Sequence, residues 1–294
     1  MDISYQTVKN ILYNTKSREW FGTDYTMNLY RGCNLGCIYC DSRSDCYRID
    51  NFDVVQAKKH SIQLLERELK RKKNGVIGFG SMSDPYNHLE KQTLITKEAL
   101  TMIERYQFGA VLSTKSNMIL RDINILKKVN QHASLLVGFS ITTTDDPLCK
   151  KIERNAPGAS QRFEAMKVLS EQGIYTGTIM MPVIPFITSD KDNIMSIIQK
   201  TYASGGKFIY PWFALSLRDS QRHYFYQWLE KIFPGLKNTY QNTYKNNYLC
   251  YPRNHEILQD LFITECEKLS IKYKIGDIIA SYQSKYDAGQ LDLF

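Results

Sequence analysis

Three closely spaced cysteines are the strongest chemical signal in the sequence. The segment RGCNLGCIYC contains Cys33, Cys37 and Cys40 at the spacing Cys-x3-Cys-x2-Cys. Three thiolates on one short loop can hold three irons of a [4Fe–4S] cluster, and they leave the fourth iron open because such clusters ordinarily take four cysteines. Gly32 and Gly36 would let the backbone wrap closely around the cluster. The loop therefore predicts an iron–sulfur centre with one free coordination position.

Two other interpretations of the same cysteines remain open. Cys46 follows Cys40 by six residues and could complete a four-thiolate zinc site. Zinc loops usually pair two Cys-x2-Cys knuckles, however, and this segment does not. Alternatively, the thiols are buried and bind nothing.

Composition limits the class of protein. The chain has 294 residues, seven of them cysteine, and a formal net charge of +8. No apolar stretch approaches the ~18 residues that cross a bilayer, and the N-terminus lacks the basic start and apolar core of a signal peptide. We expect a cytoplasmic protein without a membrane partner, because thiols stay reduced in that compartment. The positive charge fits DNA or another nucleic acid as a partner.

Apolar strands alternate with amphipathic helices over most of the chain. Helices following strands imply right-handed crossovers and a parallel sheet. The pattern predicts an α/β fold, an incomplete (β/α)6 TIM-type barrel over residues 25–215, with an N-terminal segment at 1–24 and a C-terminal helical extension at 216–294. In such barrels the active site lies at the carboxyl ends of the strands. The six expected strands are Tyr25–Tyr30, Gly75–Gly80, Gly109–Ser113, Ser134–Ile141, Ile174–Met181 and Lys207–Phe213.

The expected helices follow from apolar residues at helical spacing. Those of the barrel are Asp53–Lys73, Thr93–Tyr106, Arg121–Val129, Ser160–Gln172 and Asp190–Ala203. Ser220–Phe233 and Asn254–Ser270 are expected in the extension.

The cysteine loop, placed directly after the first strand of a βα series, resembles the radical S-adenosylmethionine (radical SAM) superfamily. More narrowly, the chain resembles its spore photoproduct lyase-like branch, also called DNA repair photolyase-like. The resemblance covers residues 20–215 well and the remainder loosely. Its matching motifs are YRGC and YC around the loop, SDPY and LE at 83–90, TKS and RD at 114–122, ER to RFEA at 153–165, and PVIP at 182–185.

The resemblance implies that S-adenosylmethionine binds the open iron through its amino and carboxylate groups. One electron from the cluster then cleaves the sulfonium, and a 5′-deoxyadenosyl radical abstracts a hydrogen atom from the substrate. An electron donor is therefore an implied partner, and Tyr39, between two cluster ligands, is expected to pack over the cofactor. The backbone near Met181 and Val183 is expected to frame the adenine.

Several polar residues at the strand ends are candidates for binding the cofactor. Ser83 and Asp84 suit its ammonium group, although Ser-Asp-Pro is also a common turn. Lys115 suits its carboxylate, and Ser140 suits the same group or the ribose. Glu153 and Arg162 either contact the cofactor or form an ion pair.

The sequence departs from the spore lyase pattern at two positions on the substrate side. Asp41 stands where that enzyme has a second tyrosine after the third cluster cysteine. Ser81 stands where it has a hydrogen-donating cysteine, and an O–H bond is a poor hydrogen-atom donor to a carbon radical. We therefore do not expect true spore photoproduct lyase activity. Cys149, Cys250 and Cys266 are further candidates for donors or ligands.

The last five residues resemble the short peptide with which bacterial repair and replication proteins bind the sliding clamp. A polar anchor followed by apolar side chains can fill a groove on a partner. Alternatively, these residues pack against the barrel of their own chain. They are Gln290, Leu291, Asp292, Leu293 and Phe294.

Three functions remain open at this stage. The first is a radical SAM enzyme, a lyase or other radical-transfer enzyme, that acts on nucleic acid or a DNA lesion. The second is the same chemistry on a peptide, a tRNA or a small metabolite. The third is a non-catalytic, metal-stabilised module that associates with DNA.

Overall fold

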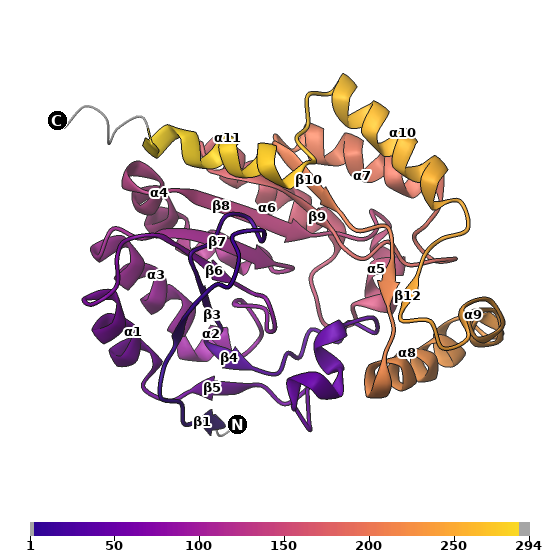
Figure 1. The fold of residues 1–294 in the computed structure, drawn as a ribbon, viewed down its shortest axis with the longest axis horizontal. Helices are drawn as coiled ribbons and strands as arrows, with labels where there is room; N and C mark the ends of the chain where they lie inside the picture. Colours follow the sequence, from indigo (N-terminus) through magenta and orange to yellow (C-terminus); the bar gives the residue numbers. More distant parts are fainter. Residues whose placement is uncertain (1–2, 288–294) are drawn as a thin grey trace.

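A seven-stranded sheet forms the centre of the protein (Figure 1). The computed structural model describes residues 3–287, with side chains up to residue 283. Six strands are mutually parallel and follow one another in chain order across the sheet, which confirms the predicted incomplete barrel. These strands are β3 (Tyr25–Met27), β6 (Val76–Phe79), β7 (Gly109–Thr114), β8 (Leu135–Ser140), β9 (Tyr175–Met180) and β10 (Phe208–Pro211).

The N-terminal segment adds strands that the sequence did not indicate. Strand β2 (Leu12–Asn14) pairs with β3 in the antiparallel direction, so the expectation of a purely parallel sheet was wrong at this edge. A second small sheet joins β1 (Tyr5–Gln6), β5 (Gln56–Lys58) and β4 (Tyr30–Arg31). Its central strand occupies a segment that we expected to be helical from Asp53 onward. There Ala57 pairs with both neighbouring strands, and this tertiary pairing overrides the local helical pattern.

Helices cover one face of the large sheet. Ile77, Leu112 and Val137 are fully buried within the core on that side. The covering helices all correspond to expected ones and are α1 (Ser61–Leu69), α3 (Ile95–Arg105), α4 (Ile123–His132), α6 (Ala159–Glu171) and α7 (Lys191–Ala203). The short helices α2 (Glu90–Thr93) and α5 (Asp146–Ile152) lie in the connections after β6 and β8.

The C-terminal extension contains the two expected helices and further elements that the sequence left unassigned. Helices α8 (Asp219–Ile232) and α10 (His255–Lys268) match the expectation, and α10 lies beside α7 (Figure 1). The Tyr- and Asn-rich segment between them forms α9 (Leu236–Tyr244). Tyr240 on α9 is fully buried and donates a hydrogen bond of 2.6 Å to the Pro185 carbonyl. Strand β11 (Leu215–Ser216) pairs with β12 (Leu249–Cys250) and ties the extension to the barrel.

Helix α11 (Ile275–Asp287) packs against the other face of the sheet, near the amino ends of the strands (Figure 1). Its Ile278 and Tyr282 side chains join a core with apolar residues of β6 to β10. Tyr282 also donates a hydrogen bond of 2.5 Å to the Phe21 carbonyl. The helix therefore closes the end of the barrel opposite to the carboxyl ends of the strands. Within residues 3–287, no helix is long and apolar enough to cross a membrane.

We expect Ile278→Ala to lower the free energy of unfolding by about 2–5 kcal/mol, because it removes buried methyl groups and leaves a cavity. Ile257→Ala on α10 is the matched control, since Ile257 is 71% exposed and should change stability little. Equilibrium urea unfolding measures both variants. Equal losses in the two variants would contradict this packing of α11.

Candidate functional site

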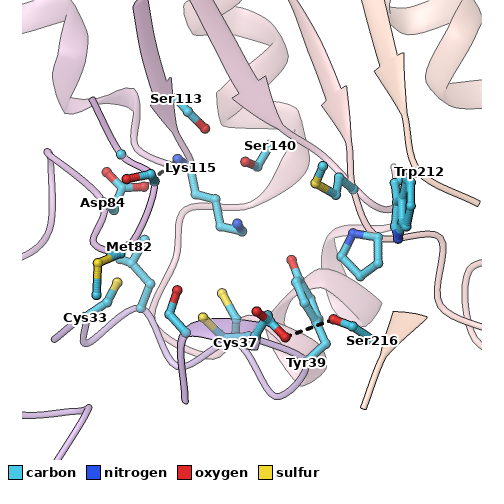
Figure 2. Close-up of a pocket in the computed structure, with 18 of the residues that line it drawn as sticks. Cys33, Cys37, Tyr39, Met82, Asp84, Ser113, Lys115, Ser140, Trp212 and Ser216 are labelled. Carbon is cyan, nitrogen blue, oxygen red and sulfur yellow. Dashed lines mark hydrogen bonds between the residues drawn. The ribbon is translucent and has the colours of Figure 1, made fainter. Parts of the chain in front are cut away.

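A cavity of about 530 Å³ opens at the carboxyl ends of β6 to β10 (Figure 2). The three cysteines of the loop and the predicted residues Tyr39, Asp84, Lys115 and Ser140 all line it. In Figure 2, Cys33 and Asp84 lie on one side of the cavity, and Trp212 and Ser216 on the other. The remaining lining residues are Leu35, Asp41, Ser42, Gly80, Ser81, Met82, Ser113, Thr114, Met181, Pro182, Leu215, Tyr248 and Leu249.

Backbone contacts hold the cysteine loop in place. The Cys33 N–H donates to the Phe52 carbonyl at 2.8 Å. The Ile38 N–H donates to the Ile152 carbonyl at 2.9 Å. Gly32 has a φ of +78°, and a Cβ there would lie 2.7 Å from the Phe52 oxygen. The position therefore requires glycine, and the loop closes tightly against the segment after it.

The donor set of the loop fits an iron–sulfur cluster better than a zinc ion. Within the described residues, no three His, Cys, Asp or Glu side chains converge closely enough to hold a single ion. The ligands of a cluster bind different irons and lie farther apart than those of one ion. Cys46, the proposed fourth zinc ligand, is exposed and does not line the cavity. The cavity therefore brings the three loop thiols together without Cys46, and their role as cluster ligands stays a prediction.

Burial raises the pKa values of the loop thiols. It raises the pKa of Cys33 to about 12, with a further contribution from the negative charge of Asp84. It also raises the pKa of Cys37 well above the usual value, which the positive Lys115 offsets only in part. The site therefore favours thiolates when a positively charged metal group binds to them.

Asp84 is fixed by three hydrogen bonds. Its carboxylate accepts from the Thr114 hydroxyl at 2.7 Å, the Tyr86 N–H at 2.9 Å and the Lys115 N–H at 2.7 Å. Ser83 does not line the cavity; its hydroxyl donates to the Gly32 carbonyl at 2.5 Å. Asp84 therefore faces the cavity from the strand end as predicted, whereas Ser83 fastens that strand end to the cysteine loop.

Lys115 brings a positive charge into the cavity (Figure 2). No ion pair or hydrogen bond of its ammonium group is found among the described residues, and its Nζ lies 5.8 Å from the centre of the Tyr39 ring. Burial opposes its charged form, but the nearby Cys37 sulfur and Glu153 carboxylate outweigh this effect, so the pKa of Lys115 lies above its usual value. The cavity therefore contains a cation that is available to an anionic ligand.

Glu153 and Arg162 form a fully buried ion pair behind the cavity and do not line it. Of the two alternatives considered for these residues, the structure shows the ion pair. The Tyr39 hydroxyl also donates to Glu153, and the Cys149 sulfur lies 3.2 Å from the same carboxylate. Arg162 donates to the Ser140 carbonyl at 2.8 Å. The pair therefore connects the cysteine loop to the end of β8.

The adenine-framing role of the backbone near Met181 and Val183 stays a prediction, and none of the three spare cysteines lines the cavity. Met181 lines the cavity, whereas Val183 is buried in the core. Cys250 and Cys266 are also buried in the core away from the cavity. Ser81 lines the cavity and donates to the Asn28 side chain at 3.3 Å. The proposed clamp-binding residues, Gln290, Leu291, Asp292, Leu293 and Phe294, lie outside the described residues, so that interaction stays a prediction.

Asp41, which the sequence singled out as a departure on the substrate side, belongs to a group on the opposite wall whose other members the sequence did not indicate. The Asp41 carboxylate lines the cavity and accepts from the Ser216 hydroxyl at 3.1 Å and from Arg218 at 2.6 Å. The aromatic side chains of Trp212 and Tyr248 also line this wall and are 41% and 48% exposed. Trp212 follows β10 directly, so its position at a strand end was a usable signal. Tyr47, six residues on, also donates to Asp41 at 3.2 Å, whereas Ser216 and Arg218 lie far away in the sequence, which gave no such signal.

Comparison with known proteins agrees with this site. The family model of the Radical SAM superfamily matches residues 27–197. An uncharacterized protein of Methanocaldococcus jannaschii is 30% identical over 215 residues, which cover 72% of this chain and 78% of that protein. An uncharacterized protein of Mycobacterium tuberculosis is 25% identical over 244 residues, covering 80% of this chain and 72% of that protein.

Solved structures of spore photoproduct lyase share the fold. One mutant form superposes with a TM-score of 0.66 at 15% identity, covering 90% of this chain and 79% of that chain. Another mutant, with bound AdoMet and dinucleoside spore photoproduct, gives a TM-score of 0.65 at 14% identity, covering 90% and 78%. The chain therefore belongs to the Radical SAM superfamily, which implies a [4Fe–4S] cluster and S-adenosylmethionine as its cofactors.

Proposed function

We propose that this radical SAM enzyme acts on a base of a nucleic acid, in the reducing cytoplasm. The observation that carries the proposal is the contrast between the two walls of the cavity. One wall presents the thiols, Asp84 and Lys115, and the other presents aromatic rings and a carboxylate held by its neighbours. The first wall suits the cofactors and the second suits a flat polar substrate.

On the cofactor side, Cys33, Cys37 and Cys40 would hold the cluster. Lys115 would bind the carboxylate of S-adenosylmethionine, because it lines the cavity and its ammonium forms no ion pair or hydrogen bond with the described residues. Asp84 would bind the amino group, since a carboxylate that accepts three hydrogen bonds still has a free lone pair. When bound, the two cofactors supply a strong abstractor of hydrogen atoms.

On the substrate side, Trp212 and Tyr248 offer half-exposed rings on which a base can stack. Asp41 can accept a hydrogen bond from an N–H at the edge of that base. The donors Ser216 and Arg218 orient this carboxylate before any substrate arrives. Preorganisation of this kind favours one substrate geometry over others.

Two further facts support a nucleic acid rather than a peptide or a small metabolite. The net charge of +8 favours a polyanionic partner. In addition, one structure with this fold contains a dinucleoside lesion. Asp41 and Ser81 lie on the cavity where the spore lyase pattern has a tyrosine and a cysteine. We therefore propose a substrate and a hydrogen donor different from those of spore photoproduct lyase.

The first prediction concerns the cluster. We expect Cys33→Ala to prevent loading of about four irons per chain during anaerobic reconstitution, and to abolish formation of 5′-deoxyadenosine. Cys46→Ala should retain both properties, because Cys46 is exposed and lies off the cavity. Iron and sulfide analysis with chromatography of the nucleoside product measures the outcome. A protein that loads zinc and no iron would rule out enzymatic function of this type.

The second prediction concerns Lys115. We expect Lys115→Met to weaken binding of S-adenosylmethionine roughly 10- to 100-fold, the effect of losing one charge-assisted hydrogen bond. The iron content should stay unchanged. Lys128→Met is the control, because Lys128 is exposed on α4. Equilibrium binding to the reconstituted protein gives both values, and an affinity within twofold of the unsubstituted protein would contradict the assigned role.

The third prediction tests the substrate class. We expect reconstituted protein to bind DNA or RNA oligonucleotides with an affinity that falls as salt rises. For an oligonucleotide that the enzyme converts, Asp41→Asn should reduce kcat/KM by roughly tenfold or more, because a charged hydrogen-bond acceptor is lost. Asp50→Asn, at an exposed position, is the control. Mass spectrometry of digested nucleosides detects the product.

Salt-independent or absent binding, with turnover on a peptide or a metabolite instead, would overturn the nucleic-acid proposal. It would leave the radical SAM assignment intact, because the cluster prediction is measured without a substrate.

A further inference from the structure

A second cavity of about 400 Å³ adjoins the first, and the side chain of Trp212 lines both. It lies between the segment after β10 and helix α10. No charged side chain contributes to its lining within the described part of the chain. The residues that matter here are Trp212, Phe213, Tyr251, Phe262, Ile263 and Tyr273.

The floor of this second cavity is a fixed set of aromatic rings. Phe213 and Phe262 meet edge to face with centroids 5.6 Å apart, and Phe262 and Tyr273 do so at 5.9 Å. Both phenylalanines are buried. Such edge-to-face packing holds rings in defined orientations. Packed rings therefore hold the floor of this slot in place.

Several side chains in the walls of the slot expose apolar surface to solvent. Tyr251 is 41% exposed and Ile263 is 36% exposed, as is much of the Trp212 ring. These side chains are contiguous with the reaction cavity through Trp212. Exposed apolar surface of this kind, joined to a reaction site, indicates a place for part of the substrate.

The uncharged, aromatic lining of the slot indicates what kind of ligand it can bind. An uncharged aromatic slot suits a flat ring, and base–aromatic stacking tolerates any base because every base has a π-face. The outer edge near Tyr273 carries both signs of charge: the Lys274 ammonium lies 5.7 Å from the ring centre, and the Tyr273 hydroxyl donates to Glu267 at 2.9 Å. The aromatic lining, rather than charge, is therefore what favours a base.

We infer that this slot binds the base next to the reacting one on the same strand, with Trp212 separating the two. The inference rests on the proposed action on nucleic acid and adds to it that the substrate is recognised as at least two consecutive nucleotides. The strand must have its bases unstacked here, because a ring side chain lies between the two sites. A single-stranded or locally opened substrate meets this requirement.

The test combines removal of an aromatic side chain from the protein with removal of a base from the DNA. A fluorescent single-stranded DNA of about ten nucleotides, with one abasic position moved along it, is titrated with the full-length reconstituted protein. We expect weaker binding for abasic sites at two adjacent positions, by roughly five- to 100-fold each. In Tyr251→Ala, an abasic site at one of these two positions should no longer weaken binding, whereas an abasic site at the other should weaken it as before.

The matched control is Tyr13→Ala, because Tyr13 is similarly exposed on β2 and should leave both penalties in place. Ile263→Ala is a second variant of the slot and should reduce the same single penalty, which keeps the test valid if Tyr251→Ala folds poorly. Iron content and circular dichroism verify that each variant is intact.

Three results would overturn the inference, and they are distinguishable. If the unsubstituted protein binds DNA but Tyr251→Ala and Ile263→Ala leave both abasic penalties unchanged, the slot does not bind a base while the proposed function stands. If no oligonucleotide binds, the proposed function fails together with the inference. Dimerisation that these same substitutions abolish would instead assign the slot to a second copy of the chain.

Discussion

The buried carboxylate of Glu153 is the group on which the geometry of the site depends. Burial raises its pKa, but the charges of Arg162 and Lys115 lower it by more, so it stays ionised. It binds Arg162 and Tyr39, and Arg162 binds the carbonyl of Ser140. Removing one partner of such a buried pair leaves an uncompensated charge and costs about 3–5 kcal/mol. The same interaction therefore stabilises the fold and sets the position of the cysteine loop against the strand ends.

The two walls of the cavity have different origins in the chain. The cofactor wall comes from the cysteine loop and the first strand ends, where Asp84 and Lys115 are joined by a hydrogen bond. The substrate wall comes from segments after β10, which the extension holds through the β11–β12 pair. Under the proposed function, a change of extension would alter substrate binding and leave the cofactor side unchanged. The position of Asp41, on the cysteine loop but bound to Arg218, connects the two walls.

The sequence predicts the barrel well, because its strands are short apolar runs. It also predicts the cysteine ligands, because they are adjacent on one loop. It fails where partners are distant, as for Asp41 and Arg218, which are 177 residues apart. Ser83 was expected to face the cofactor, but its hydroxyl donates a hydrogen bond to the backbone carbonyl of Gly32 instead. Helix α11 was missed, although Ile275, Ile278, Ile279 and Tyr282 have helical spacing. The β5 strand was not predictable, because its two partner strands decide its conformation.

We infer that Cys33, Cys37 and Cys40 hold a cluster whose fourth iron faces the cavity and binds S-adenosylmethionine. Electron paramagnetic resonance of the reconstituted and reduced protein, recorded before and after addition of S-adenosylmethionine, tests this inference. We expect a [4Fe–4S] signal that changes when the cofactor is added, because a ligand reaches the open iron. A signal that remains the same at saturating S-adenosylmethionine would contradict it.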